Sequence, residues 1–252
     1  MPVTSRRKKG EGLARLAAGS FGAEARANKK KSATLTQQQQ DLLYHWSLHP
    51  YNFLTGVDTD GETPILWTKD EGDLFQSVKP FPRDKPHLKE YLNDLLFHRV
   101  VFIEKSRQMM ASTGVLLFAL WDILFHRARR WVLSKSTEDE AEEMLRDKVR
   151  FPHSTLPEWV RKAHPISPRP MKEVKSLLTD SYILGGAQNV ATAEARGGTA
   201  SAVIVDEAAF QDEFEEIVGA VLPMASRLYA LTTPNLDIGG RAFLKYIDKA
   251  IQ

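Results

Sequence analysis

The sequence has no cysteine among its 252 residues, which excludes disulfides, thiolate metal sites and cysteine nucleophiles. It also has no run of about 20 apolar residues, and its basic N-terminus lacks the apolar stretch of a signal peptide. The sequence therefore predicts neither a transmembrane helix nor secretion. What it does contain, 42% hydrophobic and 26% charged residues, is ordinary for a globular protein.

Positive charge gathers at the N-terminus. Residues 1–32 hold nine Lys and Arg against two Glu, a net charge of +7, which leaves −5 for the rest of a chain whose net charge is +2. Their Ala, Gly and Lys show no apolar period, so we expect residues 1–35 to form a basic, disordered arm. Two interpretations of the arm are equally good: it binds nucleic-acid phosphates without reading their sequence, or it is solvated and binds nothing.

Residues 36–98 predict a helical and loop subregion that leads into the core. Thr36 is placed to cap a short amphipathic helix. The stretch from 55 to 85 is rich in Gly, Pro and Asp, which favours loops and a hairpin. Residues 87–98 then show the apolar spacing of a second helix.

Residues 99–252 predict an α/β core. Short apolar runs, typical of buried strands, occur at 100–103, 131–133, 182–184, 202–205 and 228–231. Helical stretches alternate with them at about 112–126, 138–149 and 212–222. This alternation predicts a mostly parallel sheet with helices on both faces. We expect the basic, proline-rich segment 150–174 to lie outside that sheet.

Three of the predicted strands end in residue types that chemistry on a nucleoside triphosphate needs. Such chemistry requires amides and a cation around the phosphates, a hydroxyl and a carboxylate on Mg²⁺, and a base that positions water. In a parallel sheet these groups meet where the carboxyl ends of neighbouring strands converge. The candidate segments are therefore those that end the strands at 100–103, 202–205 and 228–231.

The first segment is "EKSRQMMAST", residues 104–113. A phosphate-binding loop normally reads G-x-x-x-x-G-K-[ST], and aligning Ser112 with its last position puts Met110 and Ala111 at the Gly-Lys pair. Lys105 then falls at the first glycine, and because such a loop folds back on itself, this lysine can reach the same phosphates. A buried strand followed by a core helix is the alternative interpretation. Met110 is strained if the loop needs a positive φ there.

The second segment is "SAVIVDEAAF", residues 201–210, in which an apolar strand ends in Asp206 and Glu207. Burying two adjacent carboxylates is costly without a cation to offset them. A metal-binding Asp followed by a water-activating Glu explains the pair. An Asp that caps the next turn explains only one of the two acids.

The third segment is "LYALTTPN", residues 228–235, whose apolar strand ends in Thr232 and Thr233. Alone it indicates only a turn, since Thr-Pro is common where loops begin. The segment becomes informative about function because it follows the other two segments in a particular order and spacing.

Taken in order, the three segments resemble the ATPase domain of the large terminase subunit, the DNA-packaging motor of tailed bacteriophages, over about residues 81–236. That family has Ser-Arg-Gln inside its phosphate loop, a hydrophobic run closed by Asp-Glu, and a Thr-Thr-Pro-like coupling motif one strand later. Some members have the loop lysine at its start, as Lys105 is here. The resemblance implies an α/β P-loop NTPase fold of the ASCE type, preceded by an N-terminal helical and loop extension.

The resemblance also implies roles at the phosphate and metal sites. Lys105 would contact the β- and γ-phosphates. Ser112 would hold Mg²⁺ by its hydroxyl, Asp206 would bind the ion through water, and Glu207 would activate the attacking water. The implied nucleotide-binding residues are Lys105, Ser106, Arg107, Gln108, Met109, Met110, Ala111, Ser112 and Thr113.

Further positions follow from the same resemblance. Thr232 and Thr233 would couple loss of the γ-phosphate to movement of a DNA-gripping surface. Arg196 would reach the ATP of a neighbouring subunit, although a surface arginine before a Gly-Gly turn is nearly as good an interpretation. Residues 134–137 would line DNA or nucleotide, although a capping box for the next helix explains them more simply. Adenine recognition is expected upstream, near 79–85.

As a whole, the resemblance implies an ATPase motor domain that uses ATP and Mg²⁺ to translocate double-stranded DNA into a procapsid. It implies a homo-oligomeric ring, with the portal protein and the small terminase subunit as partners, in the cytoplasm of the infected bacterial host and away from any membrane. Activity of the isolated chain would be weak, because a neighbour completes each site. Large terminases continue into a nuclease domain that is absent here, so we expect no DNA cleavage.

Two other functions stay open. A helicase-like DNA-dependent ATPase would share the strand order, but it needs a second motor domain for which the chain is too short. A non-hydrolysing module that binds nucleotide or tethers DNA is favoured by the missing Gly-Lys pair and by the basic arm. Glu207 argues against that module, since pure binding has no use for a second acid.

Overall fold

The computed structural model of the protein describes residues 35–70, 73, 75–106, 110–188, 200–211, 213–235 and 238–251. Residues Thr36–Gln252 form one compact unit. The predicted arm, apart from Leu35, lies outside the described residues. The division of the rest into a subregion up to residue 98 and a core after it stays a prediction.

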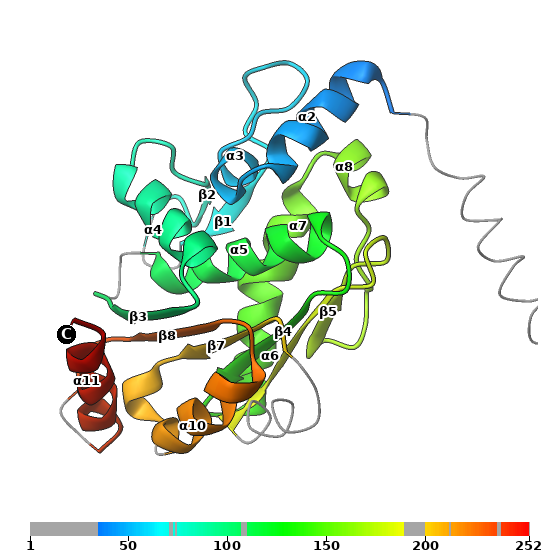
Figure 1. The fold of residues 1–252 in the computed structure, drawn as a ribbon. Coiled ribbons are helices and arrows are strands. Elements are labelled where there is room, and N and C mark those ends of the chain that lie inside the picture. The colour runs from blue at the N-terminus through cyan, green and yellow to red at the C-terminus, as the bar shows by residue number, and fades with distance from the viewer. Residues whose placement is uncertain are drawn as a thin grey trace, which may run out of the picture. The chain divides into compact units, whose positions relative to one another are not determined.

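A six-stranded sheet forms the centre of this unit (Figure 1). In spatial order its strands are β3 (Val100–Glu104), β8 (Leu228–Thr232), β7 (Ala202–Asp206), β4 (Arg130–Lys135), β6 (Tyr182–Ala187) and β5 (Glu173–Lys175). β5 pairs with β6 in antiparallel fashion, and all other neighbours pair in parallel. The predicted, mostly parallel sheet is therefore confirmed.

The prediction that segment 150–174 lies outside the sheet is wrong for its C-terminal end, where β5 begins. Val174 is fully buried between two charged residues and pairs with Ile183 at the edge of the sheet. One apolar side chain is too short a run to be recognised as a strand. An antiparallel partner also needs no crossover helix, so no helical stretch indicates it.

Helices and short helical turns connect the strands. The α-helices are α2 (Gln37–Ser47), α3 (Pro50–Leu54), α4 (Pro86–Phe97), α5 (Ala111–Phe125), α6 (Glu138–Leu145), α7 (Phe151–Thr155), α8 (Glu158–Ala163), α10 (Phe214–Met224) and α11 (Ile238–Ile251). A π-helix, η1 (Arg146–Arg150), follows α6, and a 3₁₀-helix, η2 (Ala208–Phe210), follows β7. A hairpin of β1 (Trp67–Lys69) and β2 (Val78–Pro80) lies in the stretch predicted as loops and a hairpin.

The helix starts agree with the capping residues that the sequence indicates. Thr36 accepts a hydrogen bond from the amide of Gln39, whose side chain accepts in return from the amide of Thr36. Thr137 and Glu140 form the same reciprocal capping box at the start of α6. Each box satisfies two backbone donors that the helix itself leaves free, so these two helices begin where their sequences predict.

Alternate strand residues face the two sides of the sheet and divide the core. On one side Trp131 and Tyr229 pack with α4, α5 and α6; on the other, Val132 and Val203 pack with α10 and α11. Figure 1 shows α5 and α10 on opposite sides of the strands. α5 is buried at every position from Ala111 to Leu124, as expected of a helix that is apolar all round. No helix in the described part of the chain is long and apolar enough to cross a membrane.

The strand order brings distant segments to one edge. β8 lies between β3 and β7, and β4 lies on the other side of β7. Because these four strands are parallel, their carboxyl ends share one edge of the sheet. Lys105, Thr232, Asp206 and Lys135 stand at or directly after these four ends.

Candidate active site

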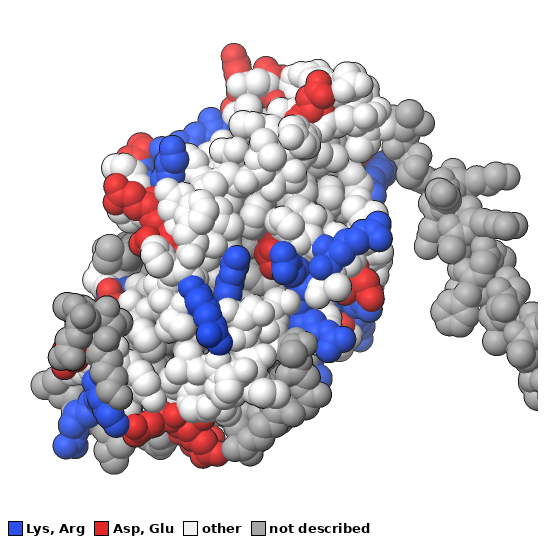
Figure 2. Space-filling model, in the orientation of Figure 1, with Lys and Arg blue, Asp and Glu red and all other residues white. Residues whose placement is uncertain are grey.

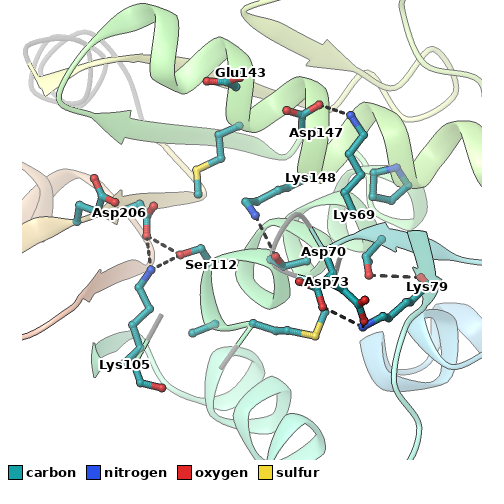
Figure 3. A pocket seen from close by; sticks show the side chains of 18 of the residues that line it. Lys69, Asp70, Asp73, Lys79, Lys105, Ser112, Glu143, Asp147, Lys148 and Asp206 are labelled. Carbon is teal, nitrogen blue, oxygen red and sulfur yellow. Dashed lines mark hydrogen bonds and ion pairs between the residues drawn. The ribbon is translucent and has the colours of Figure 1, made fainter. Parts of the chain in front are cut away.

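Three side chains from separate elements meet at the predicted phosphate and metal site (Figure 3). Lys105 follows β3, Ser112 lies in the first turn of α5, and Asp206 ends β7. Lys105 Nζ is 2.5 Å from Ser112 Oγ and 3.3 Å from Asp206 Oδ1, and Ser112 Oγ donates to the same Oδ1 at 2.7 Å. The displaced lysine therefore reaches both the serine and the aspartate.

A second lysine, Lys135, completes the charge around Asp206. Its ammonium lies 3.3 Å from Asp206 Oδ2 and 3.0 Å from Glu207 Oε2. Burial raises the pKa of Asp206, but the charges of Lys105 and Lys135, with a hydrogen bond from Ser112, outweigh burial and lower the pKa. Burial lowers the pKa of Lys135, and the two carboxylates raise it by more. The site therefore holds a charged carboxylate between charged ammonium groups.

The loop enters α5 through a residue in a strained conformation. Met110, at the second glycine position of the phosphate-loop pattern, has φ 55° and ψ 15°, in the left-handed region. This conformation destabilises a residue that has a side chain by roughly 1 kcal/mol or more. The loop therefore does need the positive φ at Met110 that was considered from the sequence, and Met110 is strained. Met110 caps α5 without a side-chain hydrogen bond, and the first turn of α5 has no acidic residue. Within α5 itself, no acidic side chain therefore offsets the positive end of the helix dipole.

Tyr91 of α4 holds this helix start in place. Its hydroxyl donates to the carbonyl of Ala111 at 2.9 Å. A Cβ at Gly114 would lie 2.8 Å from Tyr91 Cε1, so glycine lets the ring approach the helix. Burial, with a smaller effect from the charge of Asp206, raises the pKa of Tyr91 well above its ordinary value and keeps the hydroxyl a donor.

Glu207 is presented by a second left-handed residue conformation. Its φ is 55° and its ψ is 41°, directly before η2, and its side chain is 46% exposed. Behind it the fully buried Gln211 donates to the carbonyl of Asp206 at 2.7 Å and accepts from Ser134 Oγ at 3.2 Å. These bonds support a strained backbone of the kind that is found at functional sites.

The two threonines at the end of β8 lie in different surroundings. Thr233 lines the cleft, whereas Thr232 is buried behind it. Thr232 Oγ1 accepts from the amide of Ala209 at 3.1 Å, and the Thr232 carbonyl accepts from the amide of Lys105 at 2.9 Å. Thr232 thus connects the turn after Glu207 to Lys105, at the start of the predicted phosphate loop.

These groups line a cleft of about 1440 Å³. Thr113 also lines it. From Lys105 and Asp206 the cleft passes Lys148 and reaches Lys69 and Lys79 of the β1–β2 hairpin, as Figure 3 shows. The residues that line its hairpin end include Lys69, Asp70, Asp73, Phe75, Lys79, Pro80, Pro82 and Lys85. Part of the segment 79–85, expected to recognise adenine, therefore borders the cleft.

The structure brings most of the predicted site residues together. The predicted residues that line the cleft are Lys105, Ser106, Met110, Ala111, Ser112, Thr113, Asp206, Glu207 and Thr233. Four others, Arg107, Gln108, Met109 and Arg196, lie outside the described residues. The roles of all these residues toward ATP stay predictions.

Lys135 and Lys148 line the cleft with contacts that the sequence did not predict, although residues 134–137 as a group were expected to line DNA or nucleotide. Lys135 lies within 134–137, but nothing in that polar stretch singles it out. Only strand pairing does so: Ser134 is level with Val205, which puts the next residue of each strand, Lys135 and Asp206, side by side. Lys148 lies in a charged helical stretch, where a lysine ordinarily faces solvent.

The donor set of the site fits Mg²⁺. Ser112 and Asp206 offer hard oxygen atoms 2.7 Å apart, and the ammonium of Lys105 beside both shows that a cation is accepted there. Among the described residues, no group of three or more His, Asp or Glu side chains could hold a metal ion. A magnesium ion would thus need phosphate oxygens as further ligands, as it does in many nucleotide sites.

No protein-family model and no curated protein matches this sequence. The fold is similar to that of the HK97 bacteriophage large terminase, with a TM-score of 0.53 and 14% identity over 69% of this chain and 38% of that one. The ATPase domain of the Thermus phage P74-26 large terminase is similar at a TM-score of 0.40 and 18% identity, over 56% of this chain and 64% of that one.

The likeness to the HK97 protein is one of fold, and it agrees with the predicted α/β class, a mostly parallel sheet with helices on both faces. The resemblance that the three sequence motifs indicate is thereby confirmed at the level of fold. This chain spans 38% of the length of the HK97 protein.

Proposed function

We propose that this chain is the ATPase motor domain of a large terminase, which couples hydrolysis of ATP to translocation of double-stranded DNA into a procapsid. One observation carries the proposal. Lys105, Ser112 and Asp206, from three separate elements, lie within hydrogen-bonding distance of one another, and Glu207 stands beside them at the mouth of the cleft. These are the residue types that phosphoryl transfer from ATP requires.

The residues of the cleft would have separate roles in ATP hydrolysis. Lys105 and the amides at the start of α5 would neutralise charge on the terminal phosphates. Mg²⁺ at Ser112 and Asp206 would supply further charge stabilisation to the phosphate oxygens. Glu207 would accept a proton from water as the water oxygen attacks the γ-phosphorus, while the bond from that phosphorus to the β–γ bridging oxygen breaks.

Thr232 would couple this chemistry to movement. It is hydrogen-bonded to the amide of Ala209, two residues after Glu207, and to the amide of Lys105. A shift at either place on loss of the γ-phosphate would therefore pull on the end of β8. Thr233, in the cleft, would contact the nucleotide side of the same strand end.

The working motor would be a homo-oligomeric ring on the procapsid, in the cytoplasm of the infected bacterial host. Its partners would be double-stranded DNA, the portal protein and the small terminase subunit. Arg196 of a neighbouring copy would complete each ATP site. Hydrolysis by the isolated chain would therefore be weak.

The proposal is tested by ATP hydrolysis per chain over a wide range of protein concentration, with and without duplex DNA. The rate per chain should rise with concentration, because neighbours complete the sites. It should fall by about a hundredfold or more in Glu207→Gln, which removes the base, and in Lys105→Ala, which removes the phosphate-binding cation. Lys162→Ala, at an exposed lysine of α8, should retain the wild-type rate.

A wild-type rate that equals the rates of Glu207→Gln and Lys105→Ala at every concentration, with DNA present, would overturn the proposal. ATP binding then separates the alternatives. A wild type that binds ATP without hydrolysing it would be the non-hydrolysing nucleotide-binding module.

A further inference from the structure

Lys148 is a half-buried lysine of the cleft that the proposed chemistry leaves unused. It lies in η1, and its Nζ donates to Thr113 Oγ1 at 3.3 Å. Thr113 follows Ser112, which Lys105 contacts, in the first turn of α5. Because consecutive helical residues point about 100° apart, the two lysines approach the start of α5 from different sides, as Figure 3 shows.

The charge of Lys148 has no acidic partner among the described residues. Its neighbour Asp147 is paired with Lys69 at 2.7 Å and with Arg146 at 2.9 Å. Glu143, which also lines the cleft, is paired with Arg146 at 2.8 Å. Hydrogen bonds from Arg146 and Lys69 lower the pKa of Asp147 to about 2. This carboxylate is therefore already paired with two other cations. Lys148 is left as an uncompensated positive charge.

The position of this charge favours binding of an anion beside it, because Asp206, the carboxylate next to Ser112, is already paired with Lys105 and Lys135. The start of a helix carries partial positive charge, and α5 has neither an acidic residue in its first turn nor a capping side chain. Lys148 adds a full positive charge at the same helix end. Both features favour one kind of ligand, a group with several negatively charged oxygens such as phosphate.

Lys148 lies in a π-helix and lines the cleft. η1 follows α6 directly and continues into α7. Its wider turn changes which side chains face inward, and such turns are frequent at functional sites. Val149 is fully buried in the core, and its neighbour Lys148 lines the cleft. The unusual helix geometry is thus associated with the presentation of one cation.

We propose that Lys148 is a second phosphate-binding residue of the nucleotide site and contacts the phosphate nearest the nucleoside. The inference rests on the proposed function, which puts the terminal phosphate beside Lys105 and Asp206. A polyphosphate that begins there and follows the start of α5 reaches Lys148 next. Lys148 in η1 would then add a positive charge at the far end of the phosphates, in addition to that of Lys105 at the near end.

The test measures binding of ATP and of ADP to the full chain by titration calorimetry, each nucleotide with Mg²⁺. Lys148→Gln keeps a donor for Thr113 but removes the charge, and should weaken ATP and ADP alike by about tenfold or more. Lys105→Ala should weaken ATP more than ADP. Lys148→Arg should keep the wild-type affinities, as should Lys162→Gln at an exposed pair with Glu158.

A purely structural role for Lys148 predicts a different result. Lys148→Gln would then lower the melting temperature of the nucleotide-free protein, whereas we expect no change or an increase, because a repulsive charge leaves the start of α5. A lowered melting temperature, unchanged affinities in Lys148→Gln, or a loss confined to ATP would each overturn the inference.

Failure of this inference and failure of the proposed function give different results. The wild type could bind ATP and ADP with the expected dependence on Lys148 but hydrolyse no ATP at any protein concentration. That result would contradict the proposed function and support the inference about Lys148. Hydrolysis by a wild type whose affinities match those of Lys148→Gln would do the reverse. A wild type that binds neither nucleotide would overturn both.

Discussion

At the scale of residues, the site depends on the balance of charge around Asp206. Asp206 is 2% exposed, and burying an ion so deeply costs several kcal/mol unless it is paired. Lys105 and Ser112 contact one carboxylate oxygen, and Lys135 contacts the other. Removing one of these lysines therefore leaves the Asp206 carboxylate buried with less positive charge around it.

Lys135→Met should lower the free energy of unfolding by about 3 kcal/mol, because it leaves Asp206 short of one cation. Asp206→Asn should cost less in the Lys135→Met background than in the wild type, with a coupling energy of about 1–3 kcal/mol. Urea denaturation of the two single variants and the double variant gives both values. Additive effects would contradict the charge balance. Lys172→Met, at an exposed pair with Glu138, should change stability by less than about 1 kcal/mol.

The sequence predicts the residue types of the site better than their contacts. Lys105, Ser112 and Asp206 were found because each belongs to a motif that ends a strand or begins a helix. Lys135 was not, because its partner Asp206 is 71 residues away and only the pairing of β4 with β7 brings the two together. No local pattern encodes such a contact.

At the scale of elements, the packing of α4 against α5 positions the start of α5, where the predicted phosphate site lies. Tyr91 lies over Gly114 and holds the carbonyl of Ala111. Replacing glycine by alanine inside a helix ordinarily stabilises it by about 1 kcal/mol. At this glycine the new methyl group would meet the Tyr91 ring, so the usual sign should reverse.

Gly114→Ala should lower the free energy of unfolding by about 1–2 kcal/mol, because the tyrosine ring must move away from α5. Chemical denaturation measures the change. In a Tyr91→Leu background the same substitution should be neutral or stabilising, since the obstructing ring is gone. If Gly114→Ala stabilises the protein that retains Tyr91, the ring does not hold the helix start.

Long, uniform elements were predicted well, whereas the edge strand β5 and the π-helix η1 were not. The five apolar strands and α5 can be recognised in the sequence because each is a run of apolar residues over several positions. β5 has one buried apolar residue, Val174, and η1 has the same composition as an ordinary α-helix. The difference between a π-helix and an α-helix lies in backbone hydrogen bonding, which the charged sequence of residues 146–150 does not reveal.

At the scale of the whole molecule, the order of the strands determines which strand ends, and so which side chains, meet at the candidate site. Alternating strands and helices predict a parallel sheet but leave many orders possible. The motifs reduced that choice through a family resemblance, since they require three strand ends to meet. The N-terminal extension belongs to the same packed core, because Trp121 Nε1 in α5 donates to the carbonyl of Trp46 in α2 at 2.9 Å.

Charge is distributed unevenly over the chain as a whole. On the face that Figure 2 draws, basic and acidic side chains of the described residues are interspersed. The largest excess of positive charge in the sequence is the +7 of residues 1–32. If the protein binds duplex DNA by its phosphates, this segment is the first candidate for a contact that ignores base sequence.

Deleting residues 1–34 should weaken duplex DNA binding and flatten its salt dependence, because the deletion removes nine Lys and Arg. Each neutralised phosphate contributes about 0.9 to the slope of log K against log salt, so the slope should fall by several units, with about 8 as the upper limit. Fluorescence anisotropy of a labelled duplex at several salt concentrations measures both quantities. A full-length chain with the nine residues replaced by Gln should behave like the deletion, because charge and not length makes the contact. Unchanged affinity and slope would mean that the arm is only solvated and that residues after 34 bind the DNA.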